Sequence, residues 1–144
     1  MAALRIYDAQ EMTCNFSGIP LESGLADGEF LRVENAEDAF MTVVGTDGEV
    51  TRSKSGNKMA TVTVILMQSS SGNQALSTLH NLDIETGNGA GVGPLLIRDR
   101  QGTAVYAASK AWIRKAPDAS FDRTATSREW AIDCADLKRL DGGN

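Results

Sequence analysis

The sequence predicts a mainly β fold: a sandwich or barrel of antiparallel strands with one inserted short α-helix and a long hairpin arm. Segments of alternating polar and apolar residues recur along the chain, as in half-buried strands. Turn-forming segments rich in Gly, Pro, Asn and Asp separate them at short intervals. Because 144 residues with 42% hydrophobic content suffice for one core, we expect a single domain over residues 1–144.

The expected strands follow the chain from its start to its end. They cover residues 11–17, 30–34, 39–44, 49–55, 58–68, 95–99, 103–115 and 126–137. The segments SGIPLESG, GTDGE, SGN, TGNGAGVG and APDAS lie between them and are predicted to be loops.

The segment 58–68 has one apolar face and one mixed face. Its apolar face holds Ala60, Val62, Val64 and Leu66. Thr61 and Thr63 begin the other face. The last strand alternates in the same way, with Trp130 and Ile132 facing away from Glu129. A sheet that lines a water-filled space has this pattern, and so has any solvated antiparallel sheet, so both interpretations stay open.

The helix is predicted over residues 72–84. Ser71 is the expected N-cap, and Gln74 is its expected capping-box partner. The apolar residues at helical spacing are Ala75, Leu76, Leu79 and Leu82. A short one-sided helix of this kind typically covers an open edge or end of a barrel.

Charge and hydropathy exclude several classes of partner. The formal net charge of −5 and the pI near 4.8 argue against a protein that grips nucleic acid through its phosphates. No stretch approaches the roughly 18 consecutive apolar residues of a membrane span. The start, MAALRIYDAQEM, lacks the apolar run of a signal peptide. We therefore expect a cytoplasmic protein with no membrane partner.

No catalytic, cofactor or metal site is predicted, so an enzyme is not expected. His80 is the only histidine and sits among helical leucines, where a structural role fits best. The segment GNGAGVGP precedes a strand and not a helix, so it lacks the anion-binding end of a phosphate loop. The carboxylates between Asp27 and Asp38 are interpreted as solvated surface charge.

Cys14 and Cys134 lie on apolar faces of the first and last expected strands. If those strands pair, the two sulfurs approach disulfide distance. Because a cytoplasmic protein keeps its thiols reduced, two free core thiols are the favoured interpretation.

The arm is expected over residues 45–58, GTDGEVTRSKSGNK. Its cations are Arg52, Lys54 and Lys58, and Val50 is its only apolar residue. It has no core of its own, so it is either a disordered hairpin or a segment that gains structure against another chain. Its cations would there meet an acidic surface formed by Glu34, Glu37 and Asp38. Such a head-to-tail contact stacks subunits, and rings stacked in this way form a tube.

Three segments resemble a known family. They are MTCNFSGIPLESGLADGEFLRVE, DGEVTRSKSGNKMATVTVILMQSSSGNQALSTL and GPLLIRDRQGTAVYAASKAWIRKAP. Together they resemble the tail tube proteins of contractile-tailed bacteriophages over nearly the whole chain.

The resemblance implies a structural subunit of the virion tail that forms hexameric rings and is assembled in the host cytoplasm. The rings stack into a tube with an acidic or neutral lumen, through which DNA passes in transit. The arm, including Asp47 and Gly48, would contact the neighbouring ring, and Thr61 and Thr63 are lumen candidates. The sheath, the baseplate and the tail terminator are the implied partners.

Two alternatives stay open from the sequence. The first is a tube subunit of a bacterial secretion or contractile injection system, which differs mainly in cargo. The second is a monomeric β-barrel that binds a hydrophobic ligand or acts as an enzyme. The Thr, Ala and Ser content of the strands favours polar faces over an apolar cavity.

Overall fold

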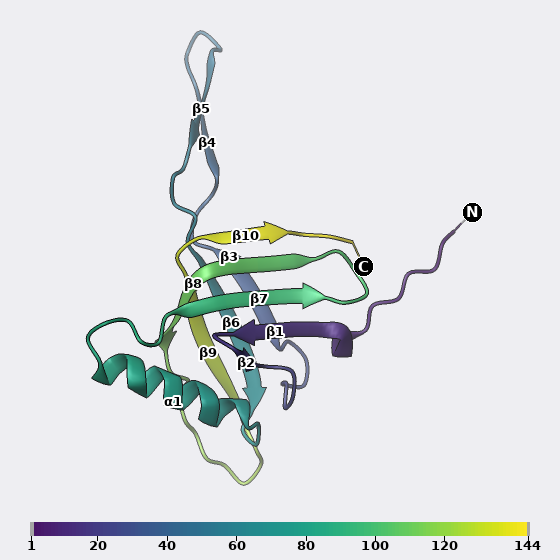
Figure 1. The fold of residues 1–144 in the computed structure, drawn as a ribbon. Helices are drawn as coiled ribbons and strands as arrows, with labels where there is room; N and C mark the ends of the chain where they lie inside the picture. The colour runs from purple at the N-terminus through teal and green to yellow at the C-terminus, as the bar shows by residue number, and fades with distance from the viewer. Residues whose placement is uncertain (1, 144) are drawn as a thin grey trace.

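The computed structural model describes residues 2–143, which form an antiparallel eight-stranded sheet, a separate two-stranded sheet and the helix α1 (Figure 1). This confirms the predicted β class with one inserted helix, but the large sheet folds over as a sandwich and does not close into a barrel. The elements in chain order are η1 (Ala9–Glu11), β1 (Met12–Phe16), β2 (Ile19–Pro20), β3 (Leu31–Asn35), β4 (Phe40–Val44), β5 (Val50–Lys54), β6 (Ala60–Met67), α1 (Gly72–Glu85), β7 (Gly93–Asp99), β8 (Val105–Lys115), β9 (Ser127–Cys134) and β10 (Leu137–Leu140).

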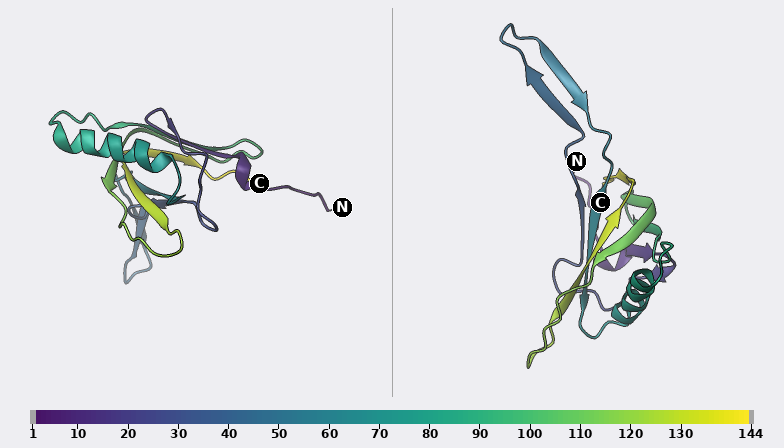
Figure 2. Two further views of the ribbon diagram at one scale, coloured as in Figure 1. Left: turned by 90° about the horizontal axis from the view of Figure 1, so that it is seen from below. Right: turned by 90° about the vertical axis from the view of Figure 1, so that its left-hand side faces the viewer.

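The large sheet makes two layers because its longest strand, β8, pairs with both β9 and β10 along the same edge. The order is β2-β1-β7-β8-β9-β6-β3, and β10 also pairs with β8. β10 pairs with the first half of β8, whereas β9 pairs with the second half and then continues beside β6. A register shift between Ile113 and Lys115 lies where β9 leaves β8. The right-hand view of Figure 2 shows the resulting layers, β1-β7-β8 and β3-β6-β9.

The core fills the space between these layers. Fully buried side chains include Phe16 and Ile97 from one layer and Val62, Leu66 and Ile132 from the other. They follow the predicted alternation, since β6 buries every second residue from Ala60 to Leu66.

Helix α1 covers one end of the sandwich, as predicted, but only with its first half. Leu76 is fully buried, whereas Leu82 is 47% exposed. The predicted capping box is wrong: Ser71 has helical backbone angles and its side chain makes no capping hydrogen bond. The hydroxyl of Ser70 caps instead, since it accepts a hydrogen bond from the Gly72 amide at 3.2 Å. A second bond, from the Ser70 hydroxyl to the carbonyl of Ser23 at 2.9 Å, ties this cap to the loop before β3.

Several boundaries differ from the prediction. The expected strand 126–137 is two strands, β9 and β10, separated at Ala135 and Asp136 where the chain changes layer. The predicted loop SGIPLESG contains β2, because Ile19 pairs with Phe16 across a two-residue turn. Strand β7 begins at Gly93, two residues before the expected start.

The thiols and the histidine lie in structural positions. Cys14 and Cys134 are both free and buried, which confirms the favoured interpretation. Strand β1 pairs with β2 and β7, so it does not pair with β9 as a disulfide would favour. His80 is half-buried on α1. No helix within residues 2–143 is both long enough and apolar enough to cross a bilayer.

Candidate assembly surfaces

The arm is a hairpin of β4 and β5 that projects away from the sandwich (Figure 1). Its turn follows from the local sequence GTDGE. The amide of Glu49 donates to the carboxylate of Asp47 at 3.0 Å, and Gly48 takes a φ of 89°, which glycine adopts without strain. The amide of Gly45 closes the loop on the carbonyl of Glu49 at 2.8 Å. Asp47 and Gly48 therefore lie at the tip.

The arm has no buried side, since every residue of β4 and β5 is exposed. Its exposed apolar residues are Phe40, Met41, Val43, Val44 and Val50. A two-stranded hairpin alone is marginally stable in water, and clustered exposed apolar residues mark contact sites. The predicted start at residue 45 was too late, because the whole apolar strand β4 belongs to the arm. The arm is thus more apolar than expected.

The pairing register sorts the arm residues into two faces. Phe40 pairs with Lys54 and Thr42 with Arg52, and the Arg52 guanidinium lies 4.2 Å from the centre of the Phe40 ring. The charged face contains Phe40, Thr42, Val44, Val50, Arg52 and Lys54. The uncharged face contains Met41, Val43, Thr51 and Ser53.

The predicted arm cations lie at different distances from the tip of the hairpin. Arg52 lies midway along the hairpin and Lys54 at its root, whereas Lys58 lies past the root, where its carbonyl accepts from the amide of Leu137 at 3.2 Å. Within residues 2–143 none of the three forms an ion pair. Their charges therefore remain available to another chain.

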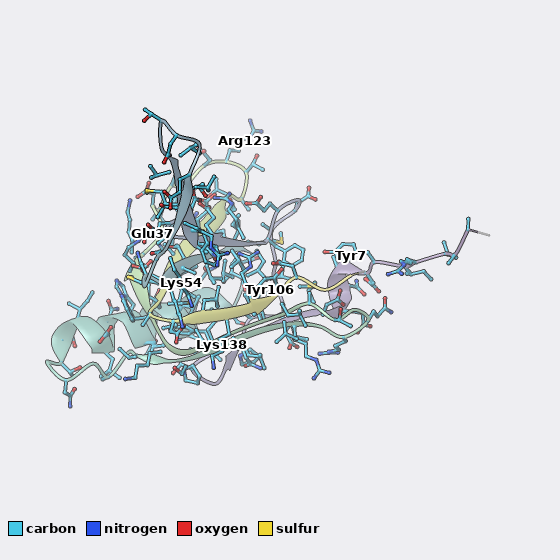
Figure 3. The ribbon with its side chains drawn as sticks, turned by 90° about the horizontal axis from the view of Figure 1, so that it is seen from above. Tyr7, Glu37, Lys54, Tyr106, Arg123 and Lys138 are labelled. Carbon is cyan, nitrogen blue, oxygen red and sulfur yellow. The ribbon has the colours of Figure 1, made fainter. Side chains whose placement is uncertain are left out.

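The predicted acidic surface lies at the root of the same arm. Glu37 accepts a hydrogen bond from the hydroxyl of Ser55, and with Asp38 it borders a hollow that also contains Lys54. Figure 3 shows Glu37 and Lys54 close to this root. Glu34, on β3, lies 3.5 Å from Arg32. These acids therefore lie at the end of the molecule that carries the arm, which the sequence pattern did not indicate.

The lumen candidates lie on the outer face of the β3-β6-β9 layer. The hydroxyl of Thr61 donates to the carboxylate of Asp133 at 3.1 Å. Thr63 borders a shallow groove of about 390 Å³, bounded by Arg32, Arg114, Lys115, Glu129 and Ala131, among others. Cations and carboxylates alternate on this face, and Arg114 lies 3.7 Å from Asp133. This outer face is polar, and its positive and negative charges are nearly balanced.

The outer face of the opposite layer differs. Arg98, Lys110 and Lys138 are exposed there, next to exposed Leu96 and Leu140. This face is cationic with apolar patches.

The loop between β8 and β9, residues 116–126, lies at the end opposite the arm (Figure 1). Arg128 is only 7% exposed and holds this loop, because it donates to the hydroxyl of Thr126 at 2.6 Å and to the carbonyl of Ser120 at 3.1 Å. Its guanidinium also lies 5.2 Å from the ring centre of Phe121, which is 78% exposed. The loop thereby presents an aromatic side chain to the outside.

Sequence reasoning missed two groups of exposed apolar residues. One is strand β4. Its sequence, FMTVV, has apolar residues on both faces of the strand, and this pattern could have indicated an exposed contact surface. The other is the N-terminal segment, in which Leu4 is 88% exposed and Ile6 is 62% exposed. Here apolar and polar residues alternate in ALRIYD, as they do in a strand, although no strand was predicted there.

Comparisons with known proteins find matches over most of the chain. The family model of the bacteriophage PhiTE tail tube protein matches residues 8–142. The chain is 32% identical to "Structural protein ORF10" of Pseudomonas phage KPP10 over 122 residues, which cover 85% of this chain and 70% of that protein.

Several solved structures share the fold at low sequence identity. The sheath/tube terminator of the extracellular contractile injection system PVC has a TM-score of 0.63 at 9% identity, covering 96% of this chain and 99% of that chain. The tube terminating cap of the anti-feeding prophage has a TM-score of 0.60 at 7% identity, covering 97% and 94%. A chain of the gene transfer agent virion has a TM-score of 0.59 at 13% identity, covering 94% and 99%. These identities show the fold alone.

The family match confirms the resemblance to phage tail tube proteins that the sequence segments indicated. The family is one of structural proteins and not of enzymes. The chain therefore belongs to the phage tail tube protein family typified by the tail tube protein of bacteriophage PhiTE.

Proposed function

We propose that this chain is the repeating subunit of a tail tube, in which hexameric rings stack into a channel that conducts DNA out of the virion. The observation that carries the proposal is the arm: a hairpin exposed on both faces, on a fold of the tube family. An isolated hairpin with five exposed apolar residues gains stability when another subunit covers it.

Stacking follows from the positions of the two ends. The arm leaves one end of the sandwich and the loop 116–126 lies at the other (Figure 1). Identical subunits stacked head to tail therefore bring the arm of one ring to the loop end of the next. The uncharged face of the arm, with Met41 and Val43, is suited to packing on a neighbour because it buries no charge.

Charge adds a second contact at the arm root. Lys54 of one subunit, together with Arg52 and Lys58, would face Glu34, Glu37 and Asp38 of another copy. Because both sets lie at the arm end, this ion-pair contact is best made between neighbours within a ring. The acidic partner surface then fixes ring register, while the tip with Asp47 and Gly48 reaches the adjacent ring.

The outer face of the β3-β6-β9 layer is our choice for the lumen. Its threonines Thr61 and Thr63 and its alternating charges offer DNA no continuous cationic surface. The other outer face, with Arg98, Lys110 and Lys138, would retard a polyanion. We assign that cationic face to the outside of the tube, where the sheath lies.

The remaining partners follow from the ends of a tube. One end would meet the baseplate and the other a tail terminator. Two solved structures with this fold, a tube terminating cap and a sheath/tube terminator, support this arrangement. Assembly would take place in the host cytoplasm, and the product would be part of the virion tail.

Excision of the arm tests the proposal. Residues 42–52 are replaced by a two-residue Asn-Gly turn joining Met41 to Ser53, which face each other in the register. Because the arm contributes nothing to the core cluster, we predict that the free energy of unfolding changes by less than about 1 kcal/mol. Tubes should disappear, as seen by electron microscopy and sedimentation.

The matched control replaces residues 88–90, in the exposed loop after α1, with a glycine linker of the same length. This control should still form tubes of normal length. Normal tubes from the arm-excised protein would contradict the proposed role of the arm.

A further inference from the structure

One end of the sandwich is covered by α1, but the side near the start of β1 is open. A groove of about 380 Å³ lies there between the two layers. Its walls include Met12, Leu31, Val33 and Tyr106, which are half-buried against the core, and its floor includes fully buried Ile97. These five residues belong to the core or pack against it and lack a cover, whereas Glu29 and Arg139 add charged groups to the lining.

Strand β3 forms one margin of the groove and has a free edge. Among residues 2–143 it pairs with β6 alone, and it ends the sheet order. Leu31 and Val33 of β3 point toward the groove, whereas Arg32 and Glu34 point outward. An unpaired edge beside an apolar groove is the arrangement that accepts an added strand.

The N-terminal segment, residues 2–7, has the properties of such a strand. It is extended and leaves the body, and Leu4 and Ile6 are exposed (Figures 1 and 2). Leu4 and Ile6 alternate with Arg5 and Tyr7, so one face is apolar and the other polar. Residues 3–7 match the five residues of β3 in length, about 17 Å at 3.3 Å per residue.

The exit direction of the segment keeps it away from its own groove. The turn η1 is fixed by the carboxylate of Asp8, which accepts from the amide of Gln10 at 3.0 Å, and by the bond from the Arg100 amide to the Glu11 carbonyl at 3.1 Å. Tyr7 still borders the groove, but Leu4 to Ile6 already lie beside Gln101 on the far side of that turn. Figure 3 shows Tyr7 where the segment leaves the body.

Charge favours the same pairing. Arg32 contacts both Glu29 and Glu34, which leaves an excess of one negative charge at the outer side of β3. Arg5 forms no ion pair within residues 2–143. On a strand added to β3 it would lie on this acidic side.

We propose that residues 3–7 of one subunit add as a strand to the free edge of β3 of a second copy, with Leu4 and Ile6 in its groove. The contact completes the sandwich of each subunit with a strand from its neighbour. It rests on the proposed assembly of this chain into an oligomer, and it uses the free edge of β3 and the N-terminal segment and not the arm strands β4 and β5.

Disulfide trapping tests the pairing in the full chain. Chains carrying Ile6→Cys are mixed with chains carrying Val33→Cys, assembled and oxidised; native Cys14 and Cys134 are buried and stay unreactive. We expect a covalent dimer on a non-reducing gel in the mixture, at least fivefold more abundant than when Arg5→Cys replaces Ile6→Cys. Arg5 is the matched control because it lies on the opposite face of the same segment.

Two results would overturn the inference. One is an equal dimer yield from Arg5→Cys and Ile6→Cys. The other is a chain with both Ile6→Cys and Val33→Cys that closes on itself and gives no dimer, which would place the segment in its own groove.

Microscopy of the same samples separates this inference from the proposed function. Tubes without the specific dimer would overturn the strand addition and leave the tube proposal standing. The specific dimer without tubes would support the strand addition and count against the tube.

A second variant pair gives an independent measurement. Leu4→Asp with Ile6→Asp should reduce oligomer formation at least tenfold in sedimentation, since two carboxylates would have to be buried against Met12, Leu31 and Ile97. Ala3→Lys, which places a charge on the outer face instead, should reduce it less than twofold. Equal effects of the two variants would overturn the proposal.

Discussion

Asn73 joins three elements through one side-chain amide. Its Oδ1 accepts from Trp130 Nε1 at 2.9 Å, and its Nδ2 donates to the carbonyl of Met67 at 2.9 Å. Trp130 is 2% exposed, so its N–H has no other ready partner. We predict that Asn73→Ala lowers the free energy of unfolding by about 1–3 kcal/mol, because it leaves a buried donor unpaired.

Urea titration followed by tryptophan fluorescence measures this change. The matched control is Gln74→Ala, one residue on in the same helix, where the side chain is exposed. The control should change stability by less than about 0.5 kcal/mol. Equal losses in the two variants would show that the helix itself, and not the amide bridge, was affected.

The two thiols should be inert in the folded protein. Burial favours the neutral form and raises the pKa of Cys14 to about 12 and of Cys134 to about 11, from an ordinary 9.0. At pH 8 both therefore stay protonated, and a thiol reagent should modify neither in the native protein and both after denaturation without reductant. Rapid modification of the native protein would contradict the structure.

The same shifts set a pH window. In the unfolded chain the thiols ionise near pH 9, whereas in the folded chain they ionise near 11 to 12. The two buried neutral thiols therefore contribute fully to the free energy of unfolding below pH 9, and this contribution is lost as the pH rises from 9 to about 12.

At the scale of the element, the arm should be sensitive to charge at its root. Arg52→Glu with Lys54→Glu is predicted to weaken assembly about tenfold, because acids would then face Glu37 and Asp38. Added salt should narrow the difference from the unmodified protein. Light scattering against salt concentration measures both effects.

The control for this prediction reverses an exposed cation outside the proposed arm contacts, Arg98→Glu, on the outer face of the β1-β7-β8 layer. It should leave the salt dependence of the root contact intact. A salt dependence unchanged by the arm variants would refute the ion-pair contact.

The elements show what a sequence pattern can and cannot predict. Alternation placed β6 and β9 with the correct faces, because a buried face must be apolar at every second residue. It could not divide the strand 126–137, because Ala135 and Asp136 mark a change of partner and not of pattern. It placed β4 but could not show that β4 lies outside the core, since an exposed apolar strand has the same sequence pattern as a core strand.

The prediction of the helix cap was wrong for a similar reason, because tertiary contacts decide which serine caps the helix. Ser70 and Ser71 are equivalent as capping residues in sequence, and a tertiary hydrogen bond to Ser23 selects Ser70. The positions of Asp47 and Gly48 in the turn of the arm could be predicted, because a turn depends on local composition. The position of Glu37 beside the arm root could not be predicted, because it depends on how distant segments come together in the fold.

At the scale of the whole molecule, the lumen assignment makes its own prediction. Replacing Thr63 with Lys adds a cation to a face that is nearly balanced in charge. We predict normal tubes but slower DNA release, by severalfold, because each ring then presents an additional ring of cations to the polyanion. Ejection kinetics of virions that carry the variant measure this.

The control is Ser109→Lys, on the outer face of the opposite layer. Its added cation would lie outside the tube and should leave release unchanged. Slower release from Ser109→Lys and normal release from Thr63→Lys would reverse the assignment of the two faces.

The subunit as a whole has surfaces suited to assembly at several points: an arm exposed on both faces, an open groove with a free strand edge, and an N-terminal segment that pairs with no strand among residues 2–143. A monomer would leave each of these apolar regions in water. A closed ring that stacks covers them with copies of the same chain.

Tube assembly can be tested by cryo-electron microscopy of the purified chain at high concentration, with short preformed tube fragments added as seeds to remove the barrier to initiation. We predict hollow tubes of stacked hexameric rings in which the arm spans two rings and the face with Thr61 and Thr63 lines the channel. Compact monomers at every concentration despite seeding, or rods in which the arm contacts no other subunit, would contradict it.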